Sequence, residues 1–367
     1  REDAFIRRTF ALRLVRRDGT PALVAPPTPR LRPGGELADE TAHELVIGKF
    51  LDAIPIHRQL AAWARRGIDV PRQTAGDHVA SWCDAFAPLA EAIRTQVLRA
   101  AIVHADESWF RVQDANLRRR CRGVNVWALA GDGQVAYRYT EDRRHVRATE
   151  VVGDDFAGFL VRDEWQGWMK LGNPTHVGCN AHARRPFALA QEDDPLARQM
   201  VALYGELYAV EDEAKAGGLS GGALWDRRRG LRQAKSAPIW SRIADHARQV
   251  IAQRPPASEL AIGAHYILNH RPALTLFLEH GQLPLDNNHA ENCLRITALI
   301  RKNSLFFGSD DGGRRAVTAL TVLHSCRLQK VEPGAYLARV TPILLARRPG
   351  QRLDLDALTP KAVAGAH

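Results

Sequence analysis

Strand-like patterning falls in one central block of the chain, about residues 101–181, with helical patterning on both sides of it. Residues 124–130 and 134–139 alternate apolar and polar side chains around a Gly-Asp-Gly turn, which predicts a β-hairpin. Three short apolar runs predict further strands, with a helical stretch before each of the last two: 101–105, 159–161 and 176–181. This order of elements predicts a mixed sheet of the α/β class.

The composition indicates a folded protein. Of the 367 residues, 45% are hydrophobic and 25% are charged, which excludes collagen-like, low-complexity and mostly disordered chains. No apolar stretch approaches the roughly 18 residues of a membrane span, and no signal peptide opens the chain. The five cysteines are far apart, with no CxxC pair, which argues against disulfides and against a zinc site built from cysteines. We expect a soluble protein of the cytoplasm with no membrane partner.

The charge of the chain favours a polyanionic partner. The 51 basic and 41 acidic residues give a net charge of +10, which is typical of proteins that bind nucleic acid. Arginine-rich proteins of high-GC bacteria share this balance, so charge alone leaves both interpretations open.

Helical periodicity runs from about residue 43 to 99, with breaks at Pro55 and Gly67. Two helices joined by a short turn with glycine match the outline of a helix-turn-helix, and an ordinary helical hairpin is the alternative. If the segment reads DNA, the side chains at the start of its third helix face the groove: Arg72, Gln73, Thr74, Asp77 and His78.

Two of the short apolar runs are followed closely by aspartates, Asp106 and Asp163. Strands that end on Asp place their carboxylates at one edge of a sheet, where they can share a Mg²⁺ ion. Glu291, on a predicted helix, is the candidate third acid of a two-metal site. The alternatives are that the aspartates are turn residues, and that Glu291 completes a capping box with Asn288. Neighbouring acids compete as ligands: Glu107, Asp154, Asp155 and Glu164.

Several motifs together resemble those of bacterial DDE transposases of the insertion sequence 66 family. HADES at 104–108 is similar to the block around the first catalytic Asp, and GCNAHARRPF at 178–187 to the block after the second. LPLDNNHAE at 283–291 is similar to the block that ends on the catalytic Glu. Three further stretches also match: IHRQ at 56–59 with WARRG at 63–67, RKN at 301–303, and FGSDDGG at 307–313.

The resemblance implies a ribonuclease-H-like sheet interrupted by a helical insertion and preceded by a helix-turn-helix-like segment. It places the acidic triad on Asp106, Asp163 and Glu291, which would bind Mg²⁺, with Mn²⁺ as a substitute. It implies cleavage and strand transfer of insertion sequence ends, with terminal repeats and target DNA as partners, in a homo-oligomer helped by accessory proteins of the element. It also implies a bacterial protein associated with the nucleoid. An inactive relic that only binds DNA, and a ribonuclease-H-like nuclease without strand transfer, are the alternatives.

Basic residues near these motifs are candidate phosphate contacts, with solvated surface charge as the alternative reading. They are His182, Arg184, Arg185, Arg295, Arg301 and Lys302.

The expected organisation has six parts. They are a basic segment and Pro-rich linker (1–40), a helical DNA-binding segment (41–99), the first part of the catalytic core (100–185), a helical insertion (186–285), the second part of the core (286–330) and a C-terminal tail (331–367). The chain begins with Arg1 rather than Met, so we expect an N-terminally truncated copy.

Overall fold

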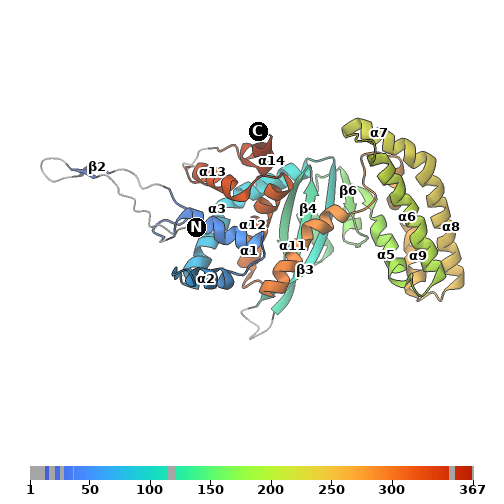
Figure 1. The fold of residues 1–367 in the computed structure, drawn as a ribbon, viewed down its shortest axis with the longest axis horizontal. Coiled ribbons are helices and arrows are strands. Elements are labelled where there is room, and N and C mark those ends of the chain that lie inside the picture. Colours follow the sequence, from blue (N-terminus) through green and yellow to red (C-terminus); the bar gives the residue numbers. More distant parts are fainter. Residues whose placement is uncertain are drawn as a thin grey trace.

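A five-stranded mixed sheet lies at the centre of the molecule (Figure 1). The structure is a computed structural model that describes residues 13–15, 21–24, 29–35, 37–114, 121–346 and 352–365. The strand order is β5-β4-β3-β6-β7. The strands are β3 (Ile102–Gln113), β4 (Cys121–Gly131), β5 (Gln134–Thr140), β6 (Phe159–Arg162) and β7 (Thr175–Gly178). The first three run antiparallel, and β6 and β7 run parallel to β3, which confirms the predicted mixed α/β sheet.

The β4–β5 hairpin turns through Asp132 and Gly133, as the sequence predicts. Gly131 pairs with Gln134, so the loop between them has two residues. Both loop residues have positive φ, 53° for Asp132 and 75° for Gly133. This is the type I′ geometry that an Asp-Gly pair adopts readily and that matches the twist of the two strands.

The expectation that the first strand ends on Asp106 is wrong, because β3 continues to Gln113. Its second half is held by β4, with pairing from His104 opposite Ala130 to Gln113 opposite Cys121. Strand length here is set by the partner strand rather than by the apolar run, which covers only the part of β3 that also pairs with β6.

Three helices precede the sheet, with breaks at the positions indicated by Pro55 and Gly67. They are α1 (Asp39–Phe50), α2 (Ile56–Ala64) and α3 (Arg72–Leu98). The apolar side of α3 is buried along its whole length, and Trp82 and Phe86 stack at 4.1 Å between ring centroids. Helix α3 is therefore part of the main hydrophobic core, and its exposed positions include Arg72 and Gln73 in the first turn as well as Asp84 and Glu91 farther along.

The segment expected as a basic stretch and linker contains a small two-stranded sheet. Strand β1 (Arg13–Val15) pairs antiparallel with β2 (Pro21–Val24). Proline is tolerated at the first residue of a strand, where no ladder hydrogen bond needs its missing N–H. Residues 1–12, 16–20 and 25–28 of this segment lie outside the described residues.

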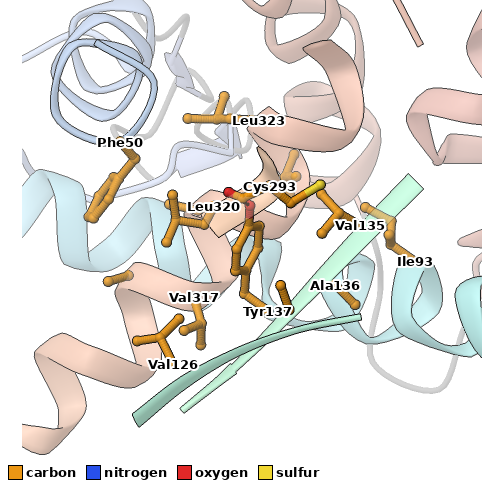
Figure 2. Packing of buried hydrophobic residues seen from close by; sticks show 14 of the residues in the cluster. Phe50, Ile93, Val126, Val135, Ala136, Tyr137, Cys293, Val317, Leu320 and Leu323 are labelled. Atoms are coloured by element: carbon orange, nitrogen blue, oxygen red, sulfur yellow. Dashed lines mark hydrogen bonds between the residues drawn. The ribbon is translucent and has the colours of Figure 1, made fainter. Parts of the chain in front are cut away.

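Helix α12 (Asp310–Leu328) covers the edge of the sheet at β5. The hydroxyl of Thr321 accepts a hydrogen bond from the Tyr137 backbone N–H at 2.9 Å, and that of Ser325 accepts one from Val135 N–H at 3.2 Å. Figure 2 shows Tyr137 pointing past Val317 and Leu320 toward Cys293. Side chains of the helix thus satisfy backbone groups that an open edge strand would leave unpaired.

A block of six helices lies at the β6–β7 side of the sheet, at the opposite end of the molecule from α1–α3 (Figure 1). The helices are α5 (Asn180–Ala190), α6 (Pro195–Lys215), α7 (Gly221–Leu231), α8 (Ala237–Gln253), α9 (Glu259–Asn269) and α10 (Arg271–Thr275). They form a second hydrophobic core around Phe187, Tyr204 and Trp240, which also takes in Val161 and Val177 of the sheet. The glycine-rich break predicted near residue 217 lies between α6 and α7.

The chain then returns to the sheet. Helix α11 (Asn288–Ser304) packs on β3 and β4, and α12 follows it. The described residues of the expected C-terminal tail form helices that pack on the core: α13 (Pro333–Leu345) packs against α1, with His43 Nε2 2.9 Å from Thr341 Oγ1, and α14 (Pro360–Ala364) packs against α12. The remaining elements are α4 (His145–Val152) and the short helical segments at Trp168–Lys170, Arg232–Ser236, Leu276–Leu278 and Asp356–Leu358. None of the helices in the described ranges is long and apolar enough to cross a membrane.

Candidate active site

The parallel pairing of β3 and β6 brings Asp106 and Asp163 level with each other. Ile102 lies opposite Phe159, and His104 lies opposite Val161. Continued by two residues, this register sets Asp106 level with Asp163, and the charge of Asp163 raises the pKa of both Asp106 and Glu107. Side chains alternate along β3, so Asp106 points to one face of the sheet and Glu107 to the other. Neighbouring strands are about 4.8 Å apart. Asp106 is therefore within β3 rather than at its end, and Asp163 directly follows β6.

Helix α11 lies on the Asp106 face and carries Glu291 in its first turn. The buried residue before the helix, Asn287, fixes its start: its amide Nδ2 donates to the Ala105 carbonyl at 2.8 Å, and its Oδ1 lies 3.1 Å from His104 Nδ1. The capping-box interpretation of Glu291 is wrong, because Asn288 is inside the helix and its side chain donates to Asp286 at 2.9 Å. The Glu291 carboxylate is left free to act elsewhere.

Asp106 is affected by the other two carboxylates. Burial, together with the negative charges of Asp163 and Glu291, raises the pKa of the Asp106 carboxyl to about 7, against the Glu107 N–H, 2.9 Å away, and the positive charge of Arg185. A cluster of partly buried like charges is costly in the absence of a cation. The arrangement is suited to holding one.

The competing acids are placed differently. Glu107 points to the other face of the sheet and pairs with Arg143, and burial raises the pKa of its carboxyl to about 8. Glu164 pairs with the buried Arg162 at 2.6 Å and with His270 at 3.0 Å. The remaining two, Asp154 and Asp155, are exposed in the loop before β6. The structure therefore favours Asp106 and Asp163 over these neighbours as ligands.

The residues present fit a divalent cation. Carboxylate oxygens suit hard ions such as Mg²⁺, and one oxygen of Glu291 is buried without a hydrogen-bond partner. The triad does not form a closed single-ion shell: among the residues that the structure describes, the one trio of potential ligands with atoms within 4.8 Å of one another is Cys179, His182 and Glu291. A site for two ions about 3.5–4 Å apart does not require all three carboxylates to contact the same ion, because different carboxylates can bind different ions.

Comparison with known proteins identifies the family. The model of the family described as "Transposase IS66 family" matches residues 37–315, which include all three carboxylates. The chain belongs to the IS66 transposase family. This membership agrees with the ribonuclease-H-like order of the sheet and makes the chain a DDE-type transposase domain, as the motifs indicate.

Three curated relatives come from Sinorhizobium fredii (strain NBRC 101917 / NGR234). The uncharacterized protein y4hP is 29% identical over 84% of this chain, y4jD is 28% identical over 86%, and y4qI is 27% identical over 94%. The chain spans 59%, 64% and 66% of the lengths of these relatives, respectively. No solved structure matches the chain.

The basic residues of the motif at 178–187 differ in exposure and in distance from Glu291. Arg185 is exposed with its guanidinium 3.7 Å from Glu291, and His182 Nδ1 is 3.5 Å from the same carboxylate oxygen. Burial lowers the pKa of His182, and the charge of Arg185 lowers it further, which favours a neutral ring. Arg184 lies on another side of α5, half-buried.

On α11, Arg295 is exposed one turn after Glu291, and Lys302 is exposed near the end of the helix. Arg301 is engaged inside the protein: its guanidinium donates to Ser108 Oγ at 3.1 Å and to the Trp109 carbonyl. These contacts fasten the end of α11 to β3. Arg295 and Lys302 are thus more available to a phosphate than Arg301.

The side chains proposed to face DNA at the start of α3 are only partly available. Arg72 and Gln73 are exposed, and Thr74 is half-buried. Asp77 pairs with Arg32 at 2.7 Å. His78 is fully buried, and its ring packs so closely on Gly35 that a Cβ there would lie 2.8 Å from it. The prediction that the His78 side chain contacts DNA is therefore wrong for this conformation, because the segment before α1 covers the imidazole ring.

Two residues at the site had no assigned role in the sequence analysis. Asn287 links α11 to β3, and Cys179 accepts a hydrogen bond on its sulfur from the Asn287 backbone N–H at 3.2 Å. Both lie in motifs that resemble the family, and the DNN run was the one signal for Asn287. Their mutual contact depends on packing between segments more than 100 residues apart.

Proposed function

We propose that this protein is the catalytic part of an active transposase that cleaves the ends of its insertion sequence and joins them to target DNA. Asp106, Asp163 and Glu291 are the proposed metal ligands. The observation that carries the proposal is the proximity of these carboxylates, two at level positions on neighbouring parallel strands and one on the helix over Asp106, where burial together with the charges of Asp163 and Glu291 raises the pKa of Asp106 to about 7.

The chain's own contribution is to hold charge and to position DNA. The carboxylates would hold Mg²⁺, which when bound supplies positive charge to the scissile phosphate and activates the attacking oxygen. In cleavage that oxygen belongs to water, and in strand transfer to the freed 3′-hydroxyl. Asn287 keeps Glu291 over β3, and Arg301 fixes the far end of the same helix. Most of the catalytic effect is expected from this fixed geometry.

Exposed basic side chains next to the triad are the proposed DNA contacts. Arg185 and Arg295 lie beside Glu291, and Arg suits phosphate because its guanidinium donates two parallel hydrogen bonds. Arg72, Gln73 and Thr74 are proposed to bind the terminal repeat farther from the cut. Two ends have to be paired for transposition, so we propose a homo-oligomer, assisted by accessory proteins of the element.

The test is cleavage of labelled DNA that carries the element's own terminal repeats, with Mg²⁺ or Mn²⁺. We expect nicking by the unmodified chain and a loss of more than about 100-fold in Asp163→Asn, which exceeds the usual effect of a residue that only orients a ligand. Asp155→Asn removes an exposed carboxylate just before β6 and is the matched control, expected to keep full activity.

Each of the other possible results supports a different function for this protein. Binding without nicking, even with Mn²⁺, contradicts catalysis and identifies a DNA-binding relic. Nicked ends that never join target DNA identify a ribonuclease-H-like nuclease without strand transfer. Nicking that survives in Asp163→Asn contradicts the assignment of the triad.

A further inference from the structure

Three side chains with soft and hard ligand atoms meet beside the triad. Cys179 is the residue before α5, His182 is in the first turn of that helix, and Glu291 is in the first turn of α11. Their Sγ, imidazole nitrogen and carboxylate oxygen all lie within 4.8 Å of one another. A cysteine and a histidine three residues apart on a helix start, together with a carboxylate from a different helix, form a convergent set of ligands.

The distances are close to those of a tetrahedral ion. With Zn–N and Zn–O bonds of about 2.0–2.1 Å, a tetrahedral N···O edge is about 3.4 Å, and an edge to sulfur is about 3.6 Å. His182 Nδ1 is 3.5 Å from Glu291 Oε1, close to the length of that edge. The sulfur lies within 4.8 Å of both other atoms, so the three atoms can converge on one ion when the sulfur moves toward them.

Two polar atoms of this set have no hydrogen-bond partner, and the guanidinium of Arg185 lies 3.7 Å from one of them, Glu291 Oε1. His182 Nδ1 and Glu291 Oε1 are both buried with no hydrogen bond, although buried polar atoms are normally satisfied. The Asn287 N–H donates to Cys179 Sγ, a contact that stabilises a thiolate. Burial raises the pKa of the free Cys179 thiol to about 12, so an ion has to displace its proton, which passes to solvent.

We propose that Cys179, His182 and Glu291 form a site for a thiophilic divalent ion, with Zn²⁺ as the expected occupant. Thiolate and imidazole bind Zn²⁺, Co²⁺ and Cd²⁺ well, whereas Mg²⁺ prefers oxygen ligands. The lack of CxxC pairs disfavours a zinc site built from cysteines, whereas this set needs a single cysteine.

The site would compete with the proposed catalytic metal. If the proposed function holds, Glu291 cannot ligate Mg²⁺ with Oε1 while that atom is bound to Zn²⁺. Occupancy by Zn²⁺ therefore withdraws one carboxylate from the triad and inhibits cleavage. Binding itself does not depend on the proposed function, because two of its three ligands are outside the triad.

Binding is tested with Co²⁺ as a spectroscopic substitute for Zn²⁺ on the whole chain. We expect one equivalent to give a thiolate-to-cobalt charge-transfer band and visible bands of tetrahedral intensity, which Zn²⁺ then displaces. Cys179→Ser and His182→Gln should each weaken binding at least 10-fold, with circular dichroism as the check that they fold. Cys121→Ser, which removes an exposed thiol elsewhere, is the matched control and should bind like the unmodified chain.

Two outcomes overturn the site: no thiolate band in the unmodified chain, or a band that remains in Cys179→Ser. Asp163→Asn should keep the band, so loss of cleavage with retention of cobalt binding separates the two metal sites. A chain that cleaves DNA with Mg²⁺ but shows no cobalt band disproves this inference alone. Competition is then measured by comparing the rate of nicking with and without equimolar Zn²⁺. We expect Zn²⁺ to lower the rate at least 10-fold in the unmodified chain and by a smaller factor in Cys179→Ser.

Discussion

At the scale of single residues, charge and burial are in conflict at the proposed catalytic centre. Asp106 is on a central strand, where its carboxyl is largely removed from water and has two carboxylates near it. A carboxylate in such a place lowers the stability of the fold unless a cation is bound. A role in binding a cation therefore explains the position of Asp106 better than a role in stabilising the sheet does.

Asp106→Asn removes this charge and keeps the shape of the side chain. At pH 7.5 without divalent metal, we expect the variant to be more stable than the unmodified chain by on the order of 1–2 kcal/mol in urea denaturation. Added Mg²⁺ at about ten times its Kd should stabilise the unmodified chain by about 1.4 kcal/mol and the variant much less. A variant that is less stable in both conditions would show that Asp106 serves the fold.

His324 on α12 is expected to make the stability of the main hydrophobic core depend on pH. Its Nδ1 is 2.7 Å from the hydroxyl of Tyr137, which also donates to the Cys293 carbonyl at 2.6 Å (Figure 2). Burial lowers the pKa of His324 to about 4, and the charge of Arg327 adds to this. The unfolded chain therefore takes up a proton near pH 6.5 that the folded chain takes up only near pH 4.

His324→Asn removes this proton uptake and keeps a side-chain N–H that can donate to the Tyr137 hydroxyl oxygen. As pH falls from about 6.5 to 4, we expect His324 to account for up to about 3 kcal/mol of lost stability in the unmodified chain. The variant should show a shallower fall of unfolding free energy over that window, measured by urea denaturation at each pH. His57→Asn, at an exposed site, is the control; an equal slope in all three proteins would rule out the role of His324.

At the scale of elements, the position of α11 depends on contacts at its two ends. Asn287 binds β3 through Ala105 and His104 at the start of the helix, and Arg301 binds Ser108 near its end. The first turn, which carries Glu291, is thereby held over the strand that carries Asp106. Helix propensity cannot set such a position, since it stabilises a helix without placing it.

Asn287→Ala and Asn288→Ala are a matched pair of neighbouring substitutions. Asn287 is fully buried with two partners on β3, and its loss leaves a buried carbonyl unpaired, so we expect a cost of about 1–3 kcal/mol. Asn288 is exposed and bonds only to Asp286, so its loss should cost under about 1 kcal/mol. Asn287→Ala should also weaken the Mg²⁺ dependence of cleavage about 10-fold or more by displacing Glu291. Equal effects of the two changes on stability and cleavage would contradict this positioning role.

At the scale of the whole molecule, the chain has two hydrophobic cores. One joins α1–α3, the sheet and α11–α14, and the other joins α5–α10 with β6 and β7. Inside the second, the fully buried Arg232 pairs with Glu211 at 2.7 Å and donates to the carbonyls of Phe277 and Leu283. These bonds tie α6, the start of α8 and the segment that leads into α11.

Arg232→Met breaks this buried pair and leaves Glu211 without its main partner. We expect the helical block to lose about 3–5 kcal/mol, because the buried Glu211 carboxylate loses its hydrogen-bonded partner and keeps only Arg228, 3.6 Å away. Urea unfolding should then separate into two transitions, with hydrogen exchange showing that α6–α10 open first. Arg229→Met, at an exposed position on the same helix turn, should leave a single transition. A single transition for Arg232→Met at lower urea would instead show that the two cores unfold together.

Local patterns were sufficient for much of the fold. The hairpin at Asp132 and Gly133, the helix breaks at Pro55 and Gly67 and the mixed sheet follow from turn chemistry and periodicity, which act between residues close in sequence. The same patterns indicated Asp106 and Asp163, because an acid next to an apolar strand is visible in the sequence itself.

Tertiary structure decided what those patterns left open. Pairing with β4 sets the length of β3, and packing against Gly35 buries the ring of His78. The Glu291 carboxylate does not cap its own helix because Asn287 and Asn288 bond to other groups. Each depends on segments that meet only after folding. The meeting of Cys179, His182 and Glu291 is of the same kind, because the third residue reaches the first two only when α11 returns across the sheet to β3.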